Sequence, residues 1–203
     1  MNNVLLDPLP TEWEGEDGRM YKLDTNFQIG IQICILNDDP EWTEMEKNNM
    51  VCELLFSDNI PDSREEREEC IEWFLNGWNH DKFKDKNNKK KKNRLIDFDV
   101  DQWRIYSAFR KQYGINLNES NMHWWEFMGL LTNLDECAYT RVIDIRNKDI
   151  KEKMSKSERK AIIEAKKIYG LDNITTLEEQ IKEAENEARN QEALAEFNKL
   201  RKR

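Results

Sequence analysis

The sequence predicts a mainly α-helical protein with a small N-terminal β hairpin and a long C-terminal helix. Seven glycines and four prolines in 203 residues are too few for the many turns of a β sandwich or barrel. Helix-start signals recur along the chain, and apolar residues follow them at helical spacing. Seven Trp, eight Phe and five Tyr can build a core, whereas 36% charged residues indicate solvated faces or surfaces reserved for partners.

The hairpin is expected close to the start of the chain. Trp13-Glu14 and Arg19–Leu23 read as two short strands around the glycine-containing turn Gly15–Gly18. Because an isolated two-stranded hairpin is marginal in water, we expect it to pack on the helices that follow.

Four helices are predicted from start signals in which a side chain caps the amide three residues further on. The capping pairs are Thr25 with Gln28, Thr43 with Glu46, Ser63 with Glu66, and Asp99 with Gln102. The inward-facing residues expected in the first two helices are Phe27, Ile31, Cys34 and Ile35, then Met45, Val51, Leu54 and Leu55. Those expected in the third, ending near Gly77, and the fourth, stopped by Gly114, are Ile71, Phe74 and Trp78, then Trp103, Tyr106, Phe109 and Tyr113.

Four further helices are expected in the second half. Asn118–Leu131 is hydrophobic nearly all round, which is typical of a buried helix, and 137–145 is a shorter helix with Val142 and Ile145 inward. Residues 157–169 form a basic amphipathic helix that ends at Gly170. Residues 176–203 form a long charged helix whose thin, alanine-rich stripe gives little support to a coiled coil.

The charge distribution suggests the division of the chain. Residues 1–81 carry 20 acidic and five basic side chains, whereas 82–94 carry eight basic and one acidic. The segment 81–94 therefore reads as a flexible basic linker between a β-hairpin and helical part, 1–80, and an aromatic-rich part, 95–170, with 171–203 as a helical extension. A chain of net charge −9 is a poor partner for nucleic acid, and the run Lys89–Lys92 has no interleaved aromatics to stack on bases.

No catalytic constellation emerges from the sequence, so we expect neither an enzyme nor a cofactor or metal site. His80 reads as a solvated loop residue and His123 as a structural residue beside the core, because no local motif supplies a catalytic partner. Asp97, Asp99 and Asp101 alternate, but the glycine and glutamate of a calcium loop are missing and Asp99 reads as a cap.

The cysteines and the terminal segments point to a cytoplasmic protein of a bacterial host. Cys34, Cys52, Cys70 and Cys137 contain no C-x-x-C pair and read as reduced thiols. We see neither a signal peptide nor an apolar stretch long enough to span a membrane.

An acidic run, Glu65-Glu66 with Glu68-Glu69, occupies the start of the third helix. Its simplest interpretation is a solvated face that is stabilised by the helix dipole. A partner-docking surface remains the alternative.

Several strings in the middle of the chain are distinctive. They are Phe98–Asp101, Ile105–Phe109, Gln112–Leu117 with its Tyr-Gly-Ile-x-Leu pattern, His123-Trp124-Trp125-Glu126-Phe127, and Val142–Arg146, together with Tyr21, Phe27–Leu36 and Trp73-Phe74-Leu75. Over roughly residues 5–170 the chain resembles the "gene product fifteen" family of siphophages and prophages of Gram-positive bacteria.

The resemblance implies a tail assembly chaperone. Such a protein would coat the tape measure protein and keep it soluble, recruit tail tube subunits, associate with itself along the client, and be absent from the mature virion. The family motifs transfer no catalytic residues, and the partner-binding residues stay undetermined. The change of composition after Gly170 is compatible with an extension made by ribosomal frameshifting.

Three other classes of function stay open at this point. A structural head–tail connector or tail completion component would be found in purified particles. A phage factor that regulates the host or inhibits its defence would bind a host protein in the absence of tail genes. An enzyme would require a catalytic pair that only the fold brings together.

Overall fold

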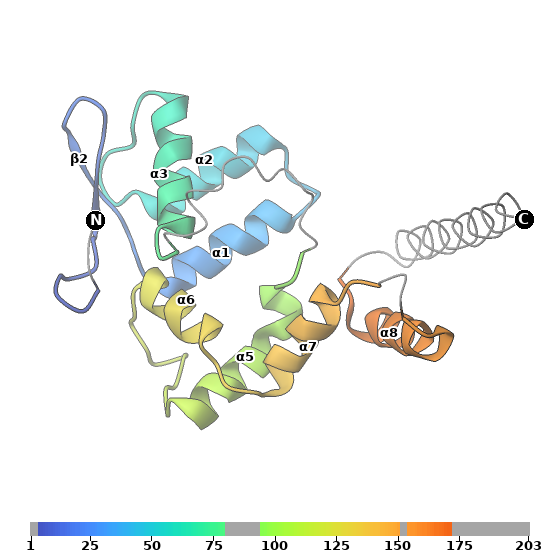
Figure 1. The fold of residues 1–203 in the computed structure, drawn as a ribbon. Helices are drawn as coiled ribbons and strands as arrows, with labels where there is room; N and C mark the ends of the chain where they lie inside the picture. The colour runs from blue at the N-terminus through green and yellow to red at the C-terminus, as the bar shows by residue number, and fades with distance from the viewer. Residues whose placement is uncertain (1–3, 80–93, 151–153, 172–203) are drawn as a thin grey trace, which may run out of the picture. The chain divides into compact units, whose positions relative to one another are not determined.

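The structure is a computed structural model that describes residues 4–79, 94–150 and 154–171 (Figure 1). These residues form two compact units, one of 4–79 with 97–137 and one of 94–96 with 138–171. The predicted mainly α-helical fold with an N-terminal hairpin is confirmed. His80, nearly all of the predicted linker 81–94 and the predicted helix 176–203 lie outside the described residues.

The hairpin consists of β1 (Glu12–Glu14) and β2 (Met20–Lys22), which pair antiparallel with Trp13 opposite Tyr21. Gly18 adopts φ 78° in the connecting turn, a left-handed conformation that favours glycine. Both aromatic side chains are buried. The rings of Tyr21 and Phe56 pack in a T-shaped arrangement, with their centroids 6.2 Å apart. The backbone N–H of Ser57 donates to Lys22 O at 3.0 Å, so the hairpin is held against the end of the second helix.

Five helices complete the first unit. They are α1 (Phe27–Asp38), α2 (Glu44–Leu55), α3 (Arg64–Asn76), α5 (Phe98–Gln112) and α6 (Trp124–Thr132). The central helix α1 packs against α2, α5 and α6, and α3 contacts both α2 and α6 (Figure 1). Ile33 at the middle of α1 is completely buried.

The core between α1, α5 and α6 is a cluster of aromatic rings. The Phe127 ring stacks on Phe27, Phe109 and Trp124, with ring centroids 5.0, 5.1 and 5.8 Å apart respectively. All four side chains are buried. Stacked aromatic pairs contribute beyond their buried area, so this cluster fixes how the three helices meet.

Two of the predicted helix caps are confirmed. Thr43 and Glu46 form a complete capping box at the start of α2. The Ser63 side chain accepts from the N–H of Glu66 at 3.2 Å, as predicted for α3. The carboxylate of Glu66 accepts from the N–H of Glu16 at 3.1 Å, which ties the hairpin turn to the start of α3.

The other two predicted caps are wrong by one and two residues. Asn26, not Thr25, caps α1 by accepting from the N–H of Gln28 at 2.8 Å. Asp97, not Asp99, caps α5 by accepting from the N–H groups of Asp99 and Val100, both at 2.9 Å. For α1, the reason is that Asn is a better cap than Thr. For α5, Asp97 lies two residues before Asp99 and reaches the first free amides of the helix.

The helix predicted over Asn118–Leu131 begins only at Trp124. Residues before it pair with the start of α1 instead: Phe27 N–H donates to Met122 O at 3.0 Å, and Trp124 N–H donates to Thr25 O at 2.8 Å. The apolar pattern is real, because Met122 is buried like Phe127. Because Met122 O and Trp124 N–H bond to residues at the start of α1, these backbone groups are satisfied without a helix at 118–123.

The inward faces differ from prediction at several positions. Met45 is 72% and Trp103 is 73% exposed, although both were expected in the core. In α1 the buried residues are Phe27, Gly30 and Ile33, whereas Ile31, Cys34 and Ile35 are only half-buried. The stripe of α2 runs through Lys47, Val51 and Leu55 at four-residue spacing, which leaves Met45 on the opposite side.

The other inward-facing residues follow the prediction more closely. In α5, Phe109 is completely buried, while Tyr106 and Tyr113 are half-buried. Gly114 adopts φ 71° directly after the helix, which confirms it as the stop.

The second unit contains α7 (Ala138–Asn147) and α8 (Lys156–Tyr169). A complete Ser155–Glu158 capping box opens α8, and its end before Gly170 is as predicted. Arg146 is 4% exposed, and its guanidinium donates to Tyr169 O at 2.7 Å and to Leu95 O at 2.8 Å. These bonds satisfy a buried charge and hold the end of α8 beside α7.

Two cysteines confirm the prediction of small core residues. Cys52 and Cys70 are buried, and burial, with smaller contributions from Cys52 and Glu69, raises the pKa of Cys70 to about 12. A thiol with a raised pKa is a poor nucleophile. Within the described ranges, no helix combines the length and apolar character that a membrane span requires.

Gly30→Ala is expected to destabilise the protein by about 1–3 kcal/mol, because the added Cβ would overlap the ring of Trp124. Gly129→Ala in α6 is the matched control: its Cβ would meet nothing within 4 Å, and removing a helical glycine stabilises by about 0.5–1 kcal/mol. Urea unfolding of both variants measures the difference. Equal free energies of unfolding would contradict the assigned packing.

Candidate protein-binding site

The most distinctive string of the sequence, His123-Trp124-Trp125, is part of the framework. The His123 side chain caps α6, because Nδ1 accepts from the N–H of Trp125 at 3.0 Å. Its Nε2 lies 2.9 Å from Pro10 O and must therefore carry the proton that it donates to this carbonyl. Burial lowers the pKa of His123, which favours the neutral ring. The predicted structural role of His123 is confirmed.

The two tryptophans join α6 to α3. Trp124 Nε1 donates to Leu75 O at 3.3 Å, and Trp125 Nε1 donates to Phe74 O at 2.7 Å. These carbonyls lie in the last turn of α3, where the helix supplies no donor of its own. A Cβ at Gly77 would overlap Trp125, so the ring packs directly on the backbone that ends α3.

The alternating aspartates also belong to the framework. Asp97 is the cap of α5. Asp101 is completely buried, and its carboxylate accepts from Arg104 at 2.9 Å and from the N–H of Asp97 at 3.3 Å. Asp97 and Asp101 therefore have structural roles at the start of α5, and the cap predicted at Asp99 is supplied by Asp97.

An apolar groove with a volume of about 350 Å³ lies between α1 and α5. Its floor includes Phe27, Phe127 and Leu117, all buried, and its walls carry Ile31 and Ile35 from α1. From α5 it is lined by Phe98, Ile105, Tyr106 and Trp103. Among the described residues, Asp99 is the one charged side chain that lines it, and Gln28, Gln102 and Asn118 add polar side chains.

Trp103 dominates the rim of this groove. It is 73% exposed and contacts Tyr106 edge-on at 6.0 Å, while the neighbouring Val100 is 56% exposed. Exposed tryptophans beside apolar pockets are characteristic of protein-binding hot spots. The arrangement suits an amphipathic helix that lays its apolar face between two helices.

Sequence reasoning missed this groove because it placed Trp103 in the core. The signal was present, since α5 carries apolar residues on more than one face: Ile105 and Phe109 are buried, whereas Val100 and Trp103 are exposed. A single helix cannot bury all of these positions against one neighbour.

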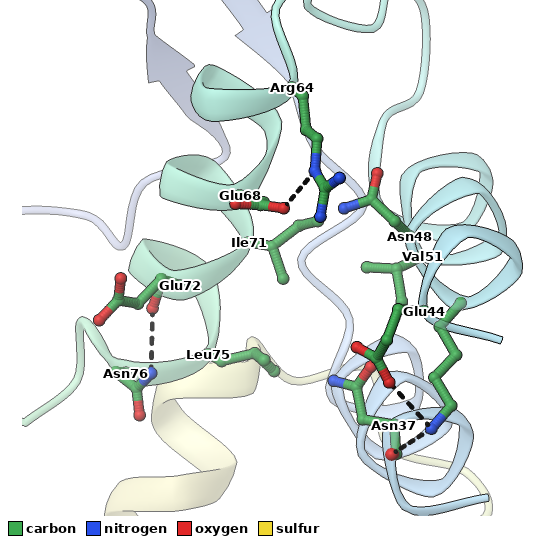
Figure 2. Close-up of a pocket in the computed structure, with 11 residues that line it drawn as sticks. Asn37, Glu44, Asn48, Val51, Arg64, Glu68, Ile71, Glu72, Leu75 and Asn76 are labelled. Carbon is green, nitrogen blue, oxygen red and sulfur yellow. Dashed lines mark hydrogen bonds and ion pairs between the residues drawn. The ribbon is translucent and has the colours of Figure 1, made fainter. Parts of the chain in front are cut away.

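A second groove, of about 310 Å³, lies between α2 and α3 (Figure 2). Val51, Ile71 and Leu75 form its apolar centre. Charged side chains line its margins: Arg64 pairs with Glu68 at 2.7 Å, and the buried Lys47 lies 3.8 Å from Glu44 and donates to Asn37 O at 2.9 Å. Glu72 adds a further exposed carboxylate.

The acidic run predicted on the third helix divides between two roles. Glu66 is half-buried and holds the hairpin turn, whereas Glu65, Glu68 and Glu69 are exposed. Glu68 lines the second groove. Together α2 and α3 carry eight acidic and three basic residues, so this groove lies in an acidic surface that favours basic partners.

Comparison with known proteins gives a match to a family of bacteriophage proteins. The model of a protein family described as bacteriophage Gp15 protein matches residues 5–171. No match to the chain was found among curated proteins or among solved structures. The matched range spans both grooves and all helices described above.

His123 is expected to make stability depend on pH just below neutrality. Because its pKa is below the ordinary 6.5 in the folded protein, the unfolded chain takes up the proton first as pH falls. The stability that His123 contributes is complete above about pH 6.5 and is lost as the pH falls through the folded-state pKa. Protonation would also place a hydrogen on Nδ1, where the Trp125 N–H is the donor.

His123→Asn provides the control, because asparagine keeps a capping acceptor but does not titrate. Urea unfolding between about pH 5 and 7.5 should show a steeper loss of stability for the unchanged protein than for the variant. Parallel pH profiles would show that His123 does not titrate with folding.

Proposed function

The chain belongs to the bacteriophage Gp15 protein family, and we propose that it acts as a tail assembly chaperone that binds the phage tape measure protein. Membership of this family indicates a phage structural or assembly protein. The observation that supports the finer role is the groove between α1 and α5, with Trp103 exposed at its rim. The proposed activity is non-catalytic binding.

The groove has the length to receive the apolar side chains of one client helix. Ile31 and Ile35 are four residues apart on α1, and Phe98, Trp103 and Tyr106 extend over two turns of α5, or about 12 Å. This length matches the apolar stripe of two turns of a bound helix. Because most of the lining is apolar, the contact depends on shape and burial more than on a particular sequence, as a client with many helices requires.

The charge of the chain supports a solubilising role. A net charge of −9 gives coated client molecules a common sign and opposes their aggregation. We propose that the coat recruits tail tube subunits, works in the cytoplasm of the bacterial host, and leaves before the virion is complete.

The test is co-expression of the tagged full chain with the tape measure protein of the same phage. The proposal expects a soluble client that co-purifies with many copies of the chain, while purified virions contain none. An insoluble, unbound tape measure protein, combined with the chain in purified virions, would instead establish a structural head–tail or tail completion component.

Trp103→Ala is expected to weaken binding of the tape measure protein by roughly thirtyfold, as for loss of a hot-spot tryptophan. Trp42→Ala removes an identical side chain that is 39% exposed and does not line the groove, so it should bind normally. Isothermal titration with a soluble tape measure segment measures both, after thermal unfolding has shown that each variant is folded. Normal binding by the Trp103 variant would exclude this groove as the client site.

A further inference from the structure

The exposed face of α8 carries two apolar residues beside two lysines. Ala161 and Ile168 are seven residues apart and therefore share one side of the helix; both are exposed, Ile168 to 73%. Lys160 and Lys167 precede them by one residue and are exposed in the same way. Glu164 lies between the two lysines on the same side of the helix, 3.9 Å from Lys160, and the two lysines leave this side with a net positive charge. The opposite side of α8 is already occupied, since Ile162 is buried.

The groove between α2 and α3 has the complementary pattern. Ile71 and Leu75 are four residues apart on α3 and form an apolar stripe with Val51 across the groove (Figure 2). Glu68 and Glu72 precede them by three residues each. Glu68 also accepts from Arg64 at 2.7 Å, one turn earlier on the same helix, and the exposed Glu72 adds a second carboxylate. Glu44, with an 89% exposed side chain, supplies a carboxylate from α2.

The net charges agree with this pairing. The groove helices α2 and α3 carry eight acidic and three basic residues, whereas α8 carries five basic and two acidic residues. Opposed surfaces of this kind attract one another and fix the register of a contact.

From these observations we propose that the α2–α3 groove binds α8 of a second copy of this chain. Ile168 enters the apolar centre formed by Val51, Ile71 and Leu75, and Lys160 and Lys167 face the carboxylates of Glu68 and Glu72. The occupant is another copy because the chain itself carries a helix with the required charge and stripe.

Such a contact joins two different surfaces of the protein, so a pair of copies still has one groove and one α8 available. Head-to-tail contacts of this type continue into open chains unless the rotation closes a ring. A groove of about 310 Å³ receives only a few side chains, so a single contact is weak. Binding of several copies to one long client would raise their effective concentration and strengthen the coat.

The inference does not depend on the proposed client, because it concerns the isolated chain. Sedimentation equilibrium of the full chain should show association that increases with protein concentration. It should also weaken at high salt, because exposed charges are screened. A chain that stays monomeric at all concentrations and at low salt would overturn the proposal.

Charge reversal identifies the surfaces. Glu68→Lys with Glu72→Lys, or Lys160→Glu with Lys167→Glu, should each weaken association by about tenfold or more. The control is Glu12→Lys with Glu14→Lys, which changes the net charge of the chain as much as the first pair does. These residues lie on the exposed face of β1 and do not line the groove. Equal weakening by this control would overturn the assignment, because it would show an effect of net charge alone.

The decisive measurement mixes the groove variant, Glu68→Lys with Glu72→Lys, and the α8 variant, Lys160→Glu with Lys167→Glu. In each variant alone, the groove and α8 carry charges of the same sign and repel each other. In the mixture, the α8 that carries the new glutamates can bind the groove that carries the new lysines, so association should return. Circular dichroism first confirms that both variants are folded. Failure of folded variants to associate when mixed would overturn the proposal, whatever the tape measure experiment shows.

Discussion

The packing of Trp124 and Trp125 on two glycines is the constraint on which the first unit depends. A side chain at Gly30 or Gly77 would overlap these rings, so α1 and the end of α3 meet α6 with bare backbone at the contact. The same indoles donate to Leu75 O and Phe74 O, which α3 cannot satisfy itself. Close packing and hydrogen bonding therefore come from the same two side chains, and neither can be replaced by a smaller aromatic without losing a bond.

This contact also shapes the groove between α1 and α5. Phe127 stacks on Trp124 on one side and on Phe27 on the other, and Phe27 and Phe127 form part of the groove floor. The floor is thus the outer surface of the aromatic core and is held rigid by it. A preformed apolar surface avoids the entropic cost of ordering at the moment of binding. Trp103 lies outside this cluster at the rim, where 73% of its surface is exposed.

The sequence predicted the fold class, the hairpin and most helices, because capping chemistry and apolar spacing are local. It failed where competing partners lie far along the chain. Thr25 looked like a cap, but its carbonyl bonds with Trp124 and Asn26 caps α1 instead. The apolar run before Trp124 suggested helix, yet Met122 pairs with Phe27. The grooves could not be predicted for a related reason. Helical spacing predicted that Trp103 and Met45 face inward, whereas their exposure depends on which helix lies opposite them.

The two grooves differ in chemistry, and the difference argues for two kinds of partner. The α1–α5 groove is lined mostly by aromatic and aliphatic side chains, with three amides and one carboxylate, Asp99, so in the proposed function it would select by burial and tolerate many sequences. The α2–α3 groove places carboxylates beside a small apolar centre, and charge patterns of that kind discriminate between partners, because a like charge in the wrong place is repelled. Permissive binding suits a client whose helices vary in sequence. Selective binding suits a contact that is repeated between identical surfaces, as in the proposed contact between copies of one chain.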